Sequence, residues 1–218
     1  MPPCFVTPQA SERCRAQQFT LSQPKAGILQ NTISKSKMAA PPEVTIKNLN
    51  GKFILNKTRS DDVDPVFVLQ GLSWLTRTAI AYASITLHVK EYEEDGVTRI
   101  DIQQIATGGI QGTTEERKLD WSEREHSDHI FGNVVGQSRF LPPDSELIED
   151  PWLKEDWLPE GEVVESLAIN KEAGWTALQI WGFAEVDGQR YYTRRVRASK
   201  GDEVVRVRLY YDWLGKDE

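Results

Sequence analysis

Residues 84–103 read SITLHVKEYEEDGVTRIDIQ, and this stretch decides the fold class. Its apolar side chains recur at every second position on both sides of a turn: Ile85, Leu87, Val89, Ile100 and Ile102. A period of two is typical of a β-strand with one buried face. The turn contains Glu94-Asp95-Gly96, and an Asp-Gly pair favours the tight reversal of a hairpin. The stretch therefore predicts two antiparallel strands.

Further segments with a strand pattern lie on both sides of this hairpin. Upstream, Leu49–Thr58 alternates around Phe53 and Leu55. Downstream, six segments share the pattern: Ile110–Leu119, Ile130–Phe140, Val163–Ile169, Ala177–Val186, Tyr191–Ala198 and Val204–Trp213. Asp187-Gly188 and Gly201-Asp202 mark the turns between the last three. A meander of this length exposes its edges unless it closes on itself, so we expect a closed sheet.

Between the first strand and the hairpin, the pattern changes to that of two short helices. Asp64-Pro65 suits a helix start, because Asp caps free N–H groups and Pro is tolerated at the first position. Gly71 suits a stop, and Ser73 opens a second helix. Apolar residues then recur at helical spacing: Leu72, Leu75, Ala79 and Tyr82. The predicted class is all-β, a single antiparallel up-and-down β-barrel of about eight to ten strands with a short helix pair after the first strand.

The charge of the chain is unevenly distributed. The 218 residues carry a net charge of −7, yet residues 1–37 carry +4, so the rest of the chain carries −11. An acidic body argues against binding of nucleic acid, which needs clustered Lys and Arg. The sequence also has no apolar run near the roughly 20 residues of a membrane helix, so no transmembrane segment is expected.

Residues 1–43 are predicted to form a disordered N-terminal extension ahead of a barrel domain at 44–218. Residues 1–37 are a disordered tail, an over-extended gene model whose true start is Met38, or a mitochondrial transit peptide, because they are acid-poor, mildly basic and rich in Ser and Gln. Both cysteines, Cys4 and Cys14, precede the barrel, which fits a reducing compartment. We expect a cytoplasmic protein, or a mitochondrial one if residues 1–37 are a transit peptide.

Residues 141–162 interrupt the regular pattern with an acidic insertion. This segment contains four prolines, eight acidic residues and one Lys, together with Trp152 and Trp157. A loop of this length is usually functional or disordered. It is a simple surface insertion, a segment docked by its two Trp side chains over a barrel mouth, or a binding site for a protein partner.

The order of these features resembles a known superfamily. Gly51-Lys52-Phe53 in the first strand is similar to the G-x-W/F opening of the calycins, and a helix pair directly after that strand is typical of the branch of intracellular fatty-acid-binding proteins. That branch binds a ligand carboxylate through an Arg on the penultimate strand and an R-x-Y motif on the last, and Arg195 and Arg208-Leu209-Tyr210 stand at the matching places. The wider sequence resembles an uncharacterised calycin-like group of filamentous fungi. The resemblance implies a barrel that holds one lipophilic ligand.

The facing of the last strand decides whether this site exists. Arg206, Arg208 and Tyr210 share one face of residues 204–213, and apolar side chains occupy the other. If the charged face points inward, it forms an anion site, since guanidinium binds carboxylate well. If the apolar face points inward, as periodicity favours, the arginines form a solvated stripe. The ligand-binding hypothesis takes the first arrangement, with these residues: Arg195, Arg206, Arg208, Tyr210 and Trp181. Trp181 is alternatively an ordinary core aromatic.

A second cluster supports an enzymatic alternative. His126 and His129, with Glu123 or Asp128, supply an acid/base pair for an isomerase or cyclase that acts on a bound lipophile. The other reading is a polar hairpin turn with surface histidines. A metal site needs further ligands, so none is expected. Gly108-Gly109-Ile110-Gln111-Gly112 lacks the Lys-Ser/Thr ending of a phosphate loop, and no cofactor is expected.

The sequence therefore favours a carrier, not an enzyme, for a small lipophilic and anionic ligand such as a fatty acid. The alternative is a small-molecule tailoring enzyme, an isomerase or cyclase, on the same scaffold. A weaker third hypothesis is a scaffold that binds a protein partner through residues 141–162.

Overall fold

A computed structural model of the chain describes residues 39–108, 110–159 and 161–216. Within these residues two α-helices, α1 (Asp64–Leu69) and α2 (Trp74–Tyr82), accompany ten strands and one short 3-10 helix, η1 (Pro151–Lys154). The strands are β1 (Gly51–Leu55), β2 (Ile85–Glu94), β3 (Val97–Ala106), β4 (Ile110–Lys118), β5 (Arg124–Asp128), β6 (Gly132–Leu141), β7 (Val163–Asn170), β8 (Trp175–Val186), β9 (Gln189–Lys200) and β10 (Glu203–Gly215). Both helices lie between β1 and β2, as the sequence predicts.

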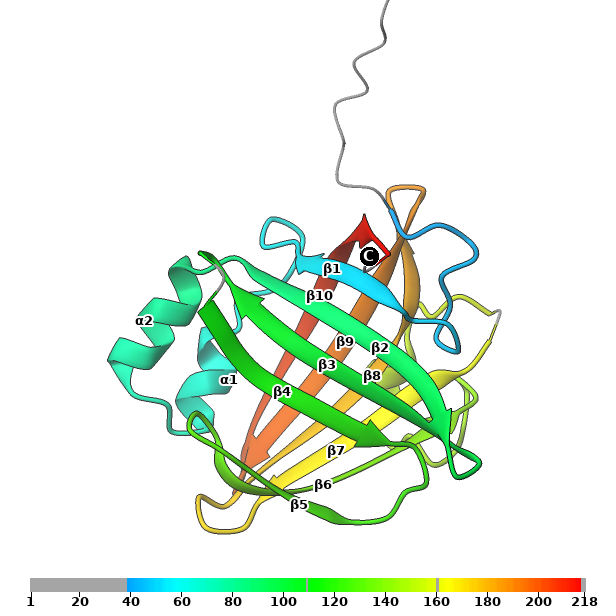
Figure 1. Ribbon diagram of the computed structural model, residues 1–218. Helices are drawn as coiled ribbons and strands as arrows, with labels where there is room; N and C mark the ends of the chain where they lie inside the picture. Colours follow the sequence, from blue (N-terminus) through cyan, green and yellow to red (C-terminus); the bar gives the residue numbers. More distant parts are fainter. Residues whose placement is uncertain (1–38, 109, 160, 217–218) are drawn as a thin grey trace, which may run out of the picture. The chain divides into compact units, whose positions relative to one another are not determined.

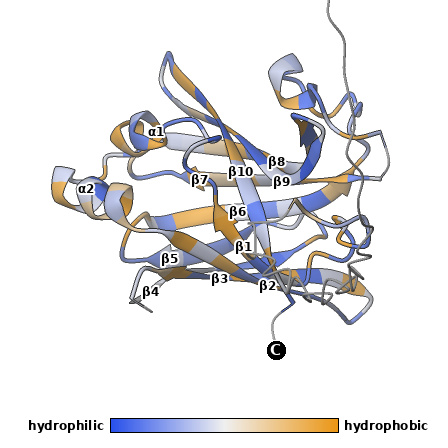
Figure 2. Cartoon of the chain, turned by 90° about the horizontal axis from the view of Figure 1, so that it is seen from above, coloured by the Kyte–Doolittle hydropathy of each residue, from blue (hydrophilic) through white to orange (hydrophobic). Residues whose placement is uncertain are grey.

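The strands form one antiparallel sheet that curls into a nearly closed barrel (Figure 1). Its order is β4-β3-β2-β1-β10-β9-β8-β7-β6-β5. Strand β1 pairs with β2 on one side and with β10 on the other, so the first and last strands lie side by side. Hydrophobic and hydrophilic residues alternate along the strands (Figure 2), as expected of a sheet with an apolar inner face. The predicted all-β up-and-down barrel is confirmed.

Strands β4 and β5 end the sheet, and the described residues form no ladder between them. Other groups connect the two ends. Arg117 of β4 reaches across to β6, where its Nη1 lies 3.3 Å from the position that a Cβ at Gly136 would take. Just after β4, the backbone N–H of Trp121 donates to the carbonyl of Ser138 on β6 at 2.9 Å. This side of the barrel is therefore joined by individual contacts and not by a strand ladder.

The helix pair follows the predicted local chemistry at its ends but not on its surface. Ser73 caps α2, since its hydroxyl accepts a hydrogen bond from the N–H of Thr76 at 3.2 Å. Asp64 does not cap α1 and instead forms an ion pair with Arg77 of α2, which connects the helices. The predicted apolar stripe of α2 faces solvent, with Leu75 71% and Tyr82 87% exposed. Thr76, Ala79 and Ile80 line the interior cavity, and Ala79 is the one residue of the predicted stripe among them. None of the described helices is long and apolar enough to cross a membrane.

One end of the barrel is filled by packed aromatic side chains. Phe53 lies at the centre, with its ring centroid 5.0 Å from that of Tyr192 and 4.9 Å from that of Trp213. Gly51 permits this packing, because its φ is +140° and a Cβ there would lie 2.1 Å from the Trp213 ring. The G-x-F opening of β1 therefore reflects a close approach between the first and last strands.

The polypeptide ahead of β1 joins this packed end. Ala40, Val44, Ile46 and Leu49 are buried in the same cluster as Phe53. The N–H of Ala40 donates to the carbonyl of Arg190 at 2.7 Å. Within the described residues, burial is therefore seen from Ala40 on, a few residues before the predicted domain start at 44. The rest of the predicted extension, residues 1–38, lies outside the described residues.

Candidate active site

The last strand turns its apolar face to the interior. Val207, Leu209 and Tyr211 line a cavity inside the barrel, whereas Arg206, Arg208 and Tyr210 point away from it. Periodicity therefore indicates the facing correctly. The expectation that these arginines and Tyr210 lie inside and hold a ligand there is wrong. Arg206 and Arg208 have acidic acceptors on the outer wall, so the strand does not have to turn them into the interior.

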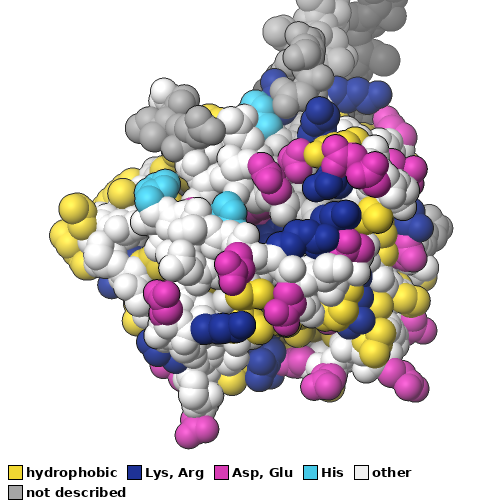
Figure 3. Space-filling model, turned by 60° about the horizontal axis from the view of Figure 1, so that its bottom comes forward, with side chains coloured by type: hydrophobic (Ala, Val, Ile, Leu, Met, Phe, Trp, Pro, Cys, Tyr) yellow, Lys and Arg dark blue, Asp and Glu magenta, His cyan; other side chains and the backbone are white. Residues whose placement is uncertain are grey.

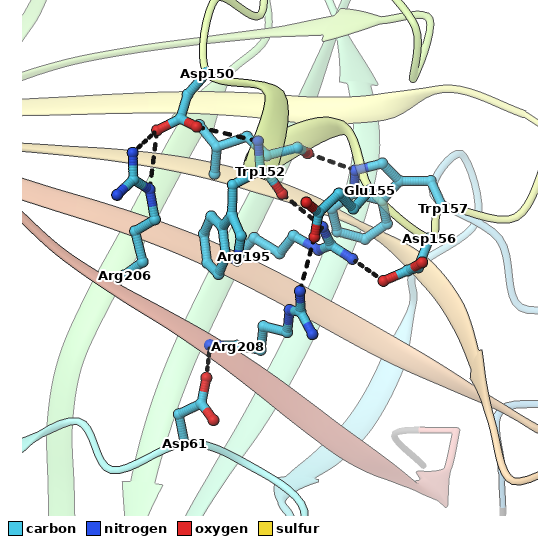
Figure 4. A network of polar contacts seen from close by, with 10 residues as sticks. Asp61, Asp150, Trp152, Glu155, Asp156, Trp157, Arg195, Arg206 and Arg208 are labelled. Atoms are coloured by element: carbon cyan, nitrogen blue, oxygen red, sulfur yellow. Dashed lines mark hydrogen bonds and ion pairs between the residues drawn. The ribbon is translucent and has the colours of Figure 1, made fainter.

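Residues 141–162 supply the acceptors for these outward arginines (Figure 4). Arg206 donates to Asp150 at 2.7 Å, and Arg208 donates to Glu155 at 2.8 Å. Ile148 and Leu153 of the same segment are fully buried against the outer side of the sheet, beside Ile180. The insertion therefore covers the outer wall of β8 to β10 and not a mouth of the barrel.

Arg195 lies at the centre of this outer network and is only 1% exposed. Its guanidinium donates to the carbonyl of Trp152 at 2.6 Å and to Asp156 at 3.0 Å, and it lies 5.0 Å from the ring centroid of Trp157 (Figure 4). Burial, together with the nearby Arg208, lowers the pKa of Arg195. Arg195 is thus a structural centre of the outer wall, which corrects its predicted role inside the barrel.

The interior contains a cavity of about 690 Å³ between the packed aromatic end and the helix pair. Strands, helices and the turns near β5 all contribute to its wall. Apolar side chains dominate the part near the helices, including Val66, Ile80, Phe131, Trp175, Val196 and Val207. Cavities of roughly 300–1,000 Å³ are typical of small-molecule sites. The volume therefore suits one ligand of moderate size.

A charged cluster occupies one wall of this cavity. Arg194 of β9 lies 3.3 Å from Glu115 of β4, measured from Nη1 to Oε1, and Arg117 donates to the other oxygen of Glu115 at 3.1 Å. Gln104 of β3 donates to Glu115 at 2.9 Å, and Arg194 Nε donates to the hydroxyl of Tyr192 at 2.9 Å. The cluster connects strands from opposite parts of the sheet.

The electrostatics of the cluster follow from its enclosure. Burial by itself raises the pKa of a carboxyl, but the guanidinium groups of Arg194 and Arg117 outweigh it and lower the pKa of Glu115 to about 2. Two guanidinium groups share one carboxylate, so the cluster carries one net positive charge. Arg194 Nη2 is buried and has no hydrogen-bond acceptor among the residues that the structure describes. An unpartnered buried donor costs about 1–3 kcal/mol, so an acceptor on a ligand would relieve this cost.

Trp181 faces inward as predicted, but it lies behind the charged cluster. The Arg194 guanidinium stacks 4.1 Å from its ring centroid, and its indole N–H donates to Gln179 at 3.0 Å. Trp181 is fully buried and does not line the cavity, whereas Arg194 does. Arg194 was not among the predicted ligand-binding residues. One signal was present, because Arg194 alternates in phase with Tyr192 and Val196, two residues of the inner face.

The histidine cluster lies at the edge of the cavity. His126, Asp128 and His129 line it, but Glu123 does not. His126 Nε2 is 3.7 Å from an oxygen of Asp128, and the other oxygen of that carboxylate accepts N–H groups of the following turn. Figure 3 shows a side of the molecule where histidine and charged side chains surround a hollow. No cluster of His, Cys, Asp and Glu that could hold a metal ion occurs among the described residues.

Two known proteins are similar to this chain in sequence. No family model matches the sequence. The "Probable pericyclase scpY" of Mollisia scopiformis is 32% identical over 182 residues, which cover 81% of this chain and 95% of that protein. The "Pericyclase pydY" of an Acremonium species is 30% identical over 182 residues, which cover 82% and 98%.

Among solved structures, apo Caenorhabditis elegans lipid binding protein 8 matches with a TM-score of 0.51 at 13% identity, over 77% of this chain and 96% of that one. A likeness at this identity shows the fold alone, which is a calycin-like β-barrel. The sequence similarity to scpY and pydY covers nearly the whole length of those two proteins. This protein is thus a member of the family of the fungal pericyclases scpY and pydY, built on a calycin-like β-barrel.

Proposed function

We propose that this protein is a pericyclase, which closes a flexible polyene into a ring inside its barrel. The observation that carries the proposal is the cavity of about 690 Å³, apolar near the helices and charged on one wall, in a chain of the scpY and pydY family. A calycin barrel also supports simple ligand binding, and fold alone does not decide between these functions. The family relationship favours the enzyme.

A pericyclic reaction places unusual demands on a protein. Bonds form and break in one cyclic movement of electrons, and the product is an isomer of the substrate, so no co-reactant is consumed. The main task is to hold a flexible chain in a conformation in which its reacting ends meet. The apolar wall near the helices is suited to this task, since it folds an extended chain back on itself and excludes water.

This chemistry changes the role assigned to the histidines. The cyclase hypothesis from sequence relied on His126 or His129 with a carboxylate as an acid/base pair. A pericyclic step needs no proton transfer, and these residues lie at the edge of the cavity. We therefore place them at the entrance, where they contact the substrate as it enters, and give them no proton to move.

A linear trienone tests the proposal directly. In this probe an enone is joined to a terminal 1,3-diene by three methylene groups, and its intramolecular [4+2] cycloaddition gives a bicyclic ketone. We expect purified protein to accelerate ring closure and to favour one diastereomer, followed by chiral chromatography and loss of diene absorbance. An unchanged rate and an unchanged product ratio at saturating protein would contradict the proposal.

Matched variants show whether the cavity is responsible. Val196→Phe replaces a small side chain of the cavity wall by an aromatic ring, and we expect it to abolish the acceleration. Val204→Phe adds the same group on the outward face of β10, where Val204 is 38% exposed, and it should retain full activity. Equal loss in both variants would indicate a general effect on folding.

A second candidate function is carriage of a lipophilic carboxylate. It is favoured by the net positive charge beside the cavity and by the unpartnered donor of Arg194. A carrier should bind a fluorescent polyene fatty acid in a one-to-one complex and return it unchanged, with no acceleration of the trienone. Native mass spectrometry of the complex after a long incubation, followed by chromatography of the released ligand, separates the two functions.

The expected location and partners are also proposals. We propose the cytoplasm, with the mitochondrion as the alternative if residues 1–37 act as a transit peptide, and imaging of a fluorescent fusion with and without these residues tests this. Binding of nucleic acid is not expected of the acidic body. A protein partner at residues 141–162 would have to use their outward side, because Trp152 and Trp157 face Arg195.

A further inference from the structure

We infer that Arg194 and Tyr211 polarise a carbonyl group of the substrate, so that the substrate class is polyenes in which the reacting alkene is conjugated to a carbonyl. The inference rests on the proposed pericyclase function and assigns a catalytic role to two residues of the cavity wall. Four observations support it, namely the position of the two donors, their charge, the gradient of polarity along the strands and the support from Glu115.

The two donors stand next to each other on the cavity wall. Arg194 of β9 is paired with Leu209 of β10, and Tyr211 lies two residues further along β10 on the same inner face. The guanidinium carbon of Arg194 is 5.7 Å from the ring centroid of Tyr211. Both residues line the cavity, and both are at least 95% buried by the fold. One ligand oxygen can therefore approach both side chains.

The charge state of this wall suits a neutral carbonyl. Glu115 offsets one of the two guanidinium groups, so the net positive charge is moderate and its partners fix it in place. Burial raises the pKa of Tyr211, which keeps its hydroxyl protonated and able to donate. A carbonyl oxygen accepts hydrogen bonds without the desolvation cost of a full negative charge.

The polarity of the wall also orients the ligand. Along β8, the inward residues change from Gln179 to Ala177 and Trp175 in the direction of the helix pair. Along β9 and β10, Arg194 gives way to Val196, and Tyr211 gives way to Leu209 and Val207. The carbonyl end of a substrate therefore binds at the charged wall, and the polyene extends over the apolar wall below α1.

Catalysis follows from the charge that develops during ring closure. In a [4+2] step, the four π electrons of the diene and two of the enone alkene become two carbon–carbon σ bonds and one new π bond, with no atom gained or lost. Electron density moves toward the conjugated carbonyl oxygen in the transition state. Fixed donors in an enclosed site bind this oxygen more strongly in the transition state than in the ground state, which raises kcat.

Glu115 acts as a positioning residue for this pair of donors. It accepts from Arg194, Arg117 and Gln104, and so holds the Arg194 guanidinium against Trp181. It is not required to touch the substrate. Its replacement by Gln should reduce kcat through a displaced Arg194, and it should leave KM nearly unchanged.

Infrared spectroscopy of a bound ketone provides a test that does not depend on turnover. The bicyclic ketone product, labelled with ¹³C at its carbonyl, is added to the wild-type protein and to three variants. We expect the carbonyl stretch to move to lower frequency in the wild type, by clearly less in Arg194→Met and Tyr211→Phe, and by the full amount in the outer-wall control Arg206→Met. Equal shifts in all four proteins would overturn the inference.

Kinetics with the trienone and with its alcohol analogue complete the test. We expect Arg194→Met to lower kcat for the trienone about 100-fold, the usual effect of losing one oxyanion donor. The same variant should change the rate of the alcohol, in which the carbonyl is reduced, by less than about threefold. Tyr211→Phe, which deletes a single oxygen, repeats the test if Arg194→Met fails to fold.

The outcomes separate this inference from the proposed function. Acceleration of the trienone that is equally strong in Arg194→Met, Tyr211→Phe and wild type would sustain the pericyclase and overturn the catalytic roles. A carbonyl shift that depends on Arg194 without any acceleration would sustain the carbonyl site and overturn the pericyclase.

Discussion

Arg194 and Arg195 are adjacent in the sequence, but their side chains lie on opposite sides of the barrel wall. Arg194 faces the cavity and lies 3.3 Å from Glu115, whereas Arg195 faces outward and donates to Asp156 at 3.0 Å. Both are almost fully buried, and each has its own stacking partner, Trp181 inside and Trp157 outside. A single strand thus carries both the charged wall of the cavity and the centre of the outer network.

Removing the outward arginines should leave the interior unaffected. In the double variant Arg206→Ala/Arg208→Ala, we expect ligand affinity to stay within about twofold of wild type, because neither side chain lines the cavity. The partly exposed ion pairs that are lost contribute about 1 kcal/mol or less each. Titration with a fluorescent polyene fatty acid measures the affinity. A tenfold loss would restore the sequence-based hypothesis that these arginines anchor a ligand.

Glu115 should make stability depend on pH in the acid range. Its pKa in the folded protein is about 2, below the ordinary value of 4.5, so its contribution to the free energy of unfolding is complete above pH 4.5 and is lost as the pH falls toward 2. Urea unfolding of wild type should therefore show declining stability in this range.

The variant Glu115→Gln should lack this part of the decline. It should also be destabilised by about 3 kcal/mol at neutral pH, because two buried guanidinium groups lose their shared carboxylate. The surface variant Glu116→Gln, one residue away on β4, serves as the control and should match wild type. An identical pH profile in Glu115→Gln and wild type would show that Glu115 is not the group responsible.

Arg195 should hold residues 141–162 on the barrel. In Arg195→Met, the two hydrogen bonds and the stacking with Trp152 and Trp157 are lost, and we expect the free energy of unfolding to fall by about 2 kcal/mol. Hydrogen exchange should accelerate in 150–158 while β1 to β4 keep their protection. Arg59→Met is the control, because the ion pair that it removes, with Asp187, does not involve residues 141–162. Uniform acceleration across the barrel would contradict a local role.

The histidines should not set the rate of ring closure. We expect His126→Gln and His129→Gln to change kcat for the trienone by less than about twofold, and we expect kcat of the wild type to be flat across the ordinary histidine pKa of about 6.5. A bell-shaped profile that disappears in either variant would instead support acid/base catalysis. Steady-state kinetics between pH 5.5 and 8 distinguishes these outcomes.

The fold was largely predictable because its signals are local. The alternation in residues 84–103, the Asp-Gly turns and the Ser73 cap each depend on a few neighbouring residues, and the structure has a hairpin, turns and a capped helix there. The apolar stripe of α2 was less informative. The face of α2 toward the cavity carries Thr76, Ala79 and Ile80, whereas Leu75 and Tyr82 of the predicted stripe face solvent.

The site was less predictable because it depends on distant pairings. Arg195 is tolerated on the outer wall only because Trp152 and Asp156, about 40 residues earlier, fold over it. Arg194 is tolerated inside only because Glu115, 79 residues away, faces it across the barrel. No local sequence pattern predicts either of these contacts. The choice of Arg195 over Arg194 was therefore an error of one residue that moved the anchor to the wrong side of the wall.

The packing of residues 141–162 over Arg195 also makes the two sides of the barrel differ in rigidity. The wall of β8 to β10 has a second layer of packed chain on its outside, whereas the opposite side has a sparsely bonded seam from β4 to β6 and a helix with no buried residue. We expect movements that admit or release a ligand to occur mainly on the side of the β4–β6 seam and α2. The backbone of Arg194 and its stacking partner Trp181 belong to the covered half, whereas Glu115 lies on β4 at the seam, so opening of the seam would change the contact that orients the Arg194 guanidinium.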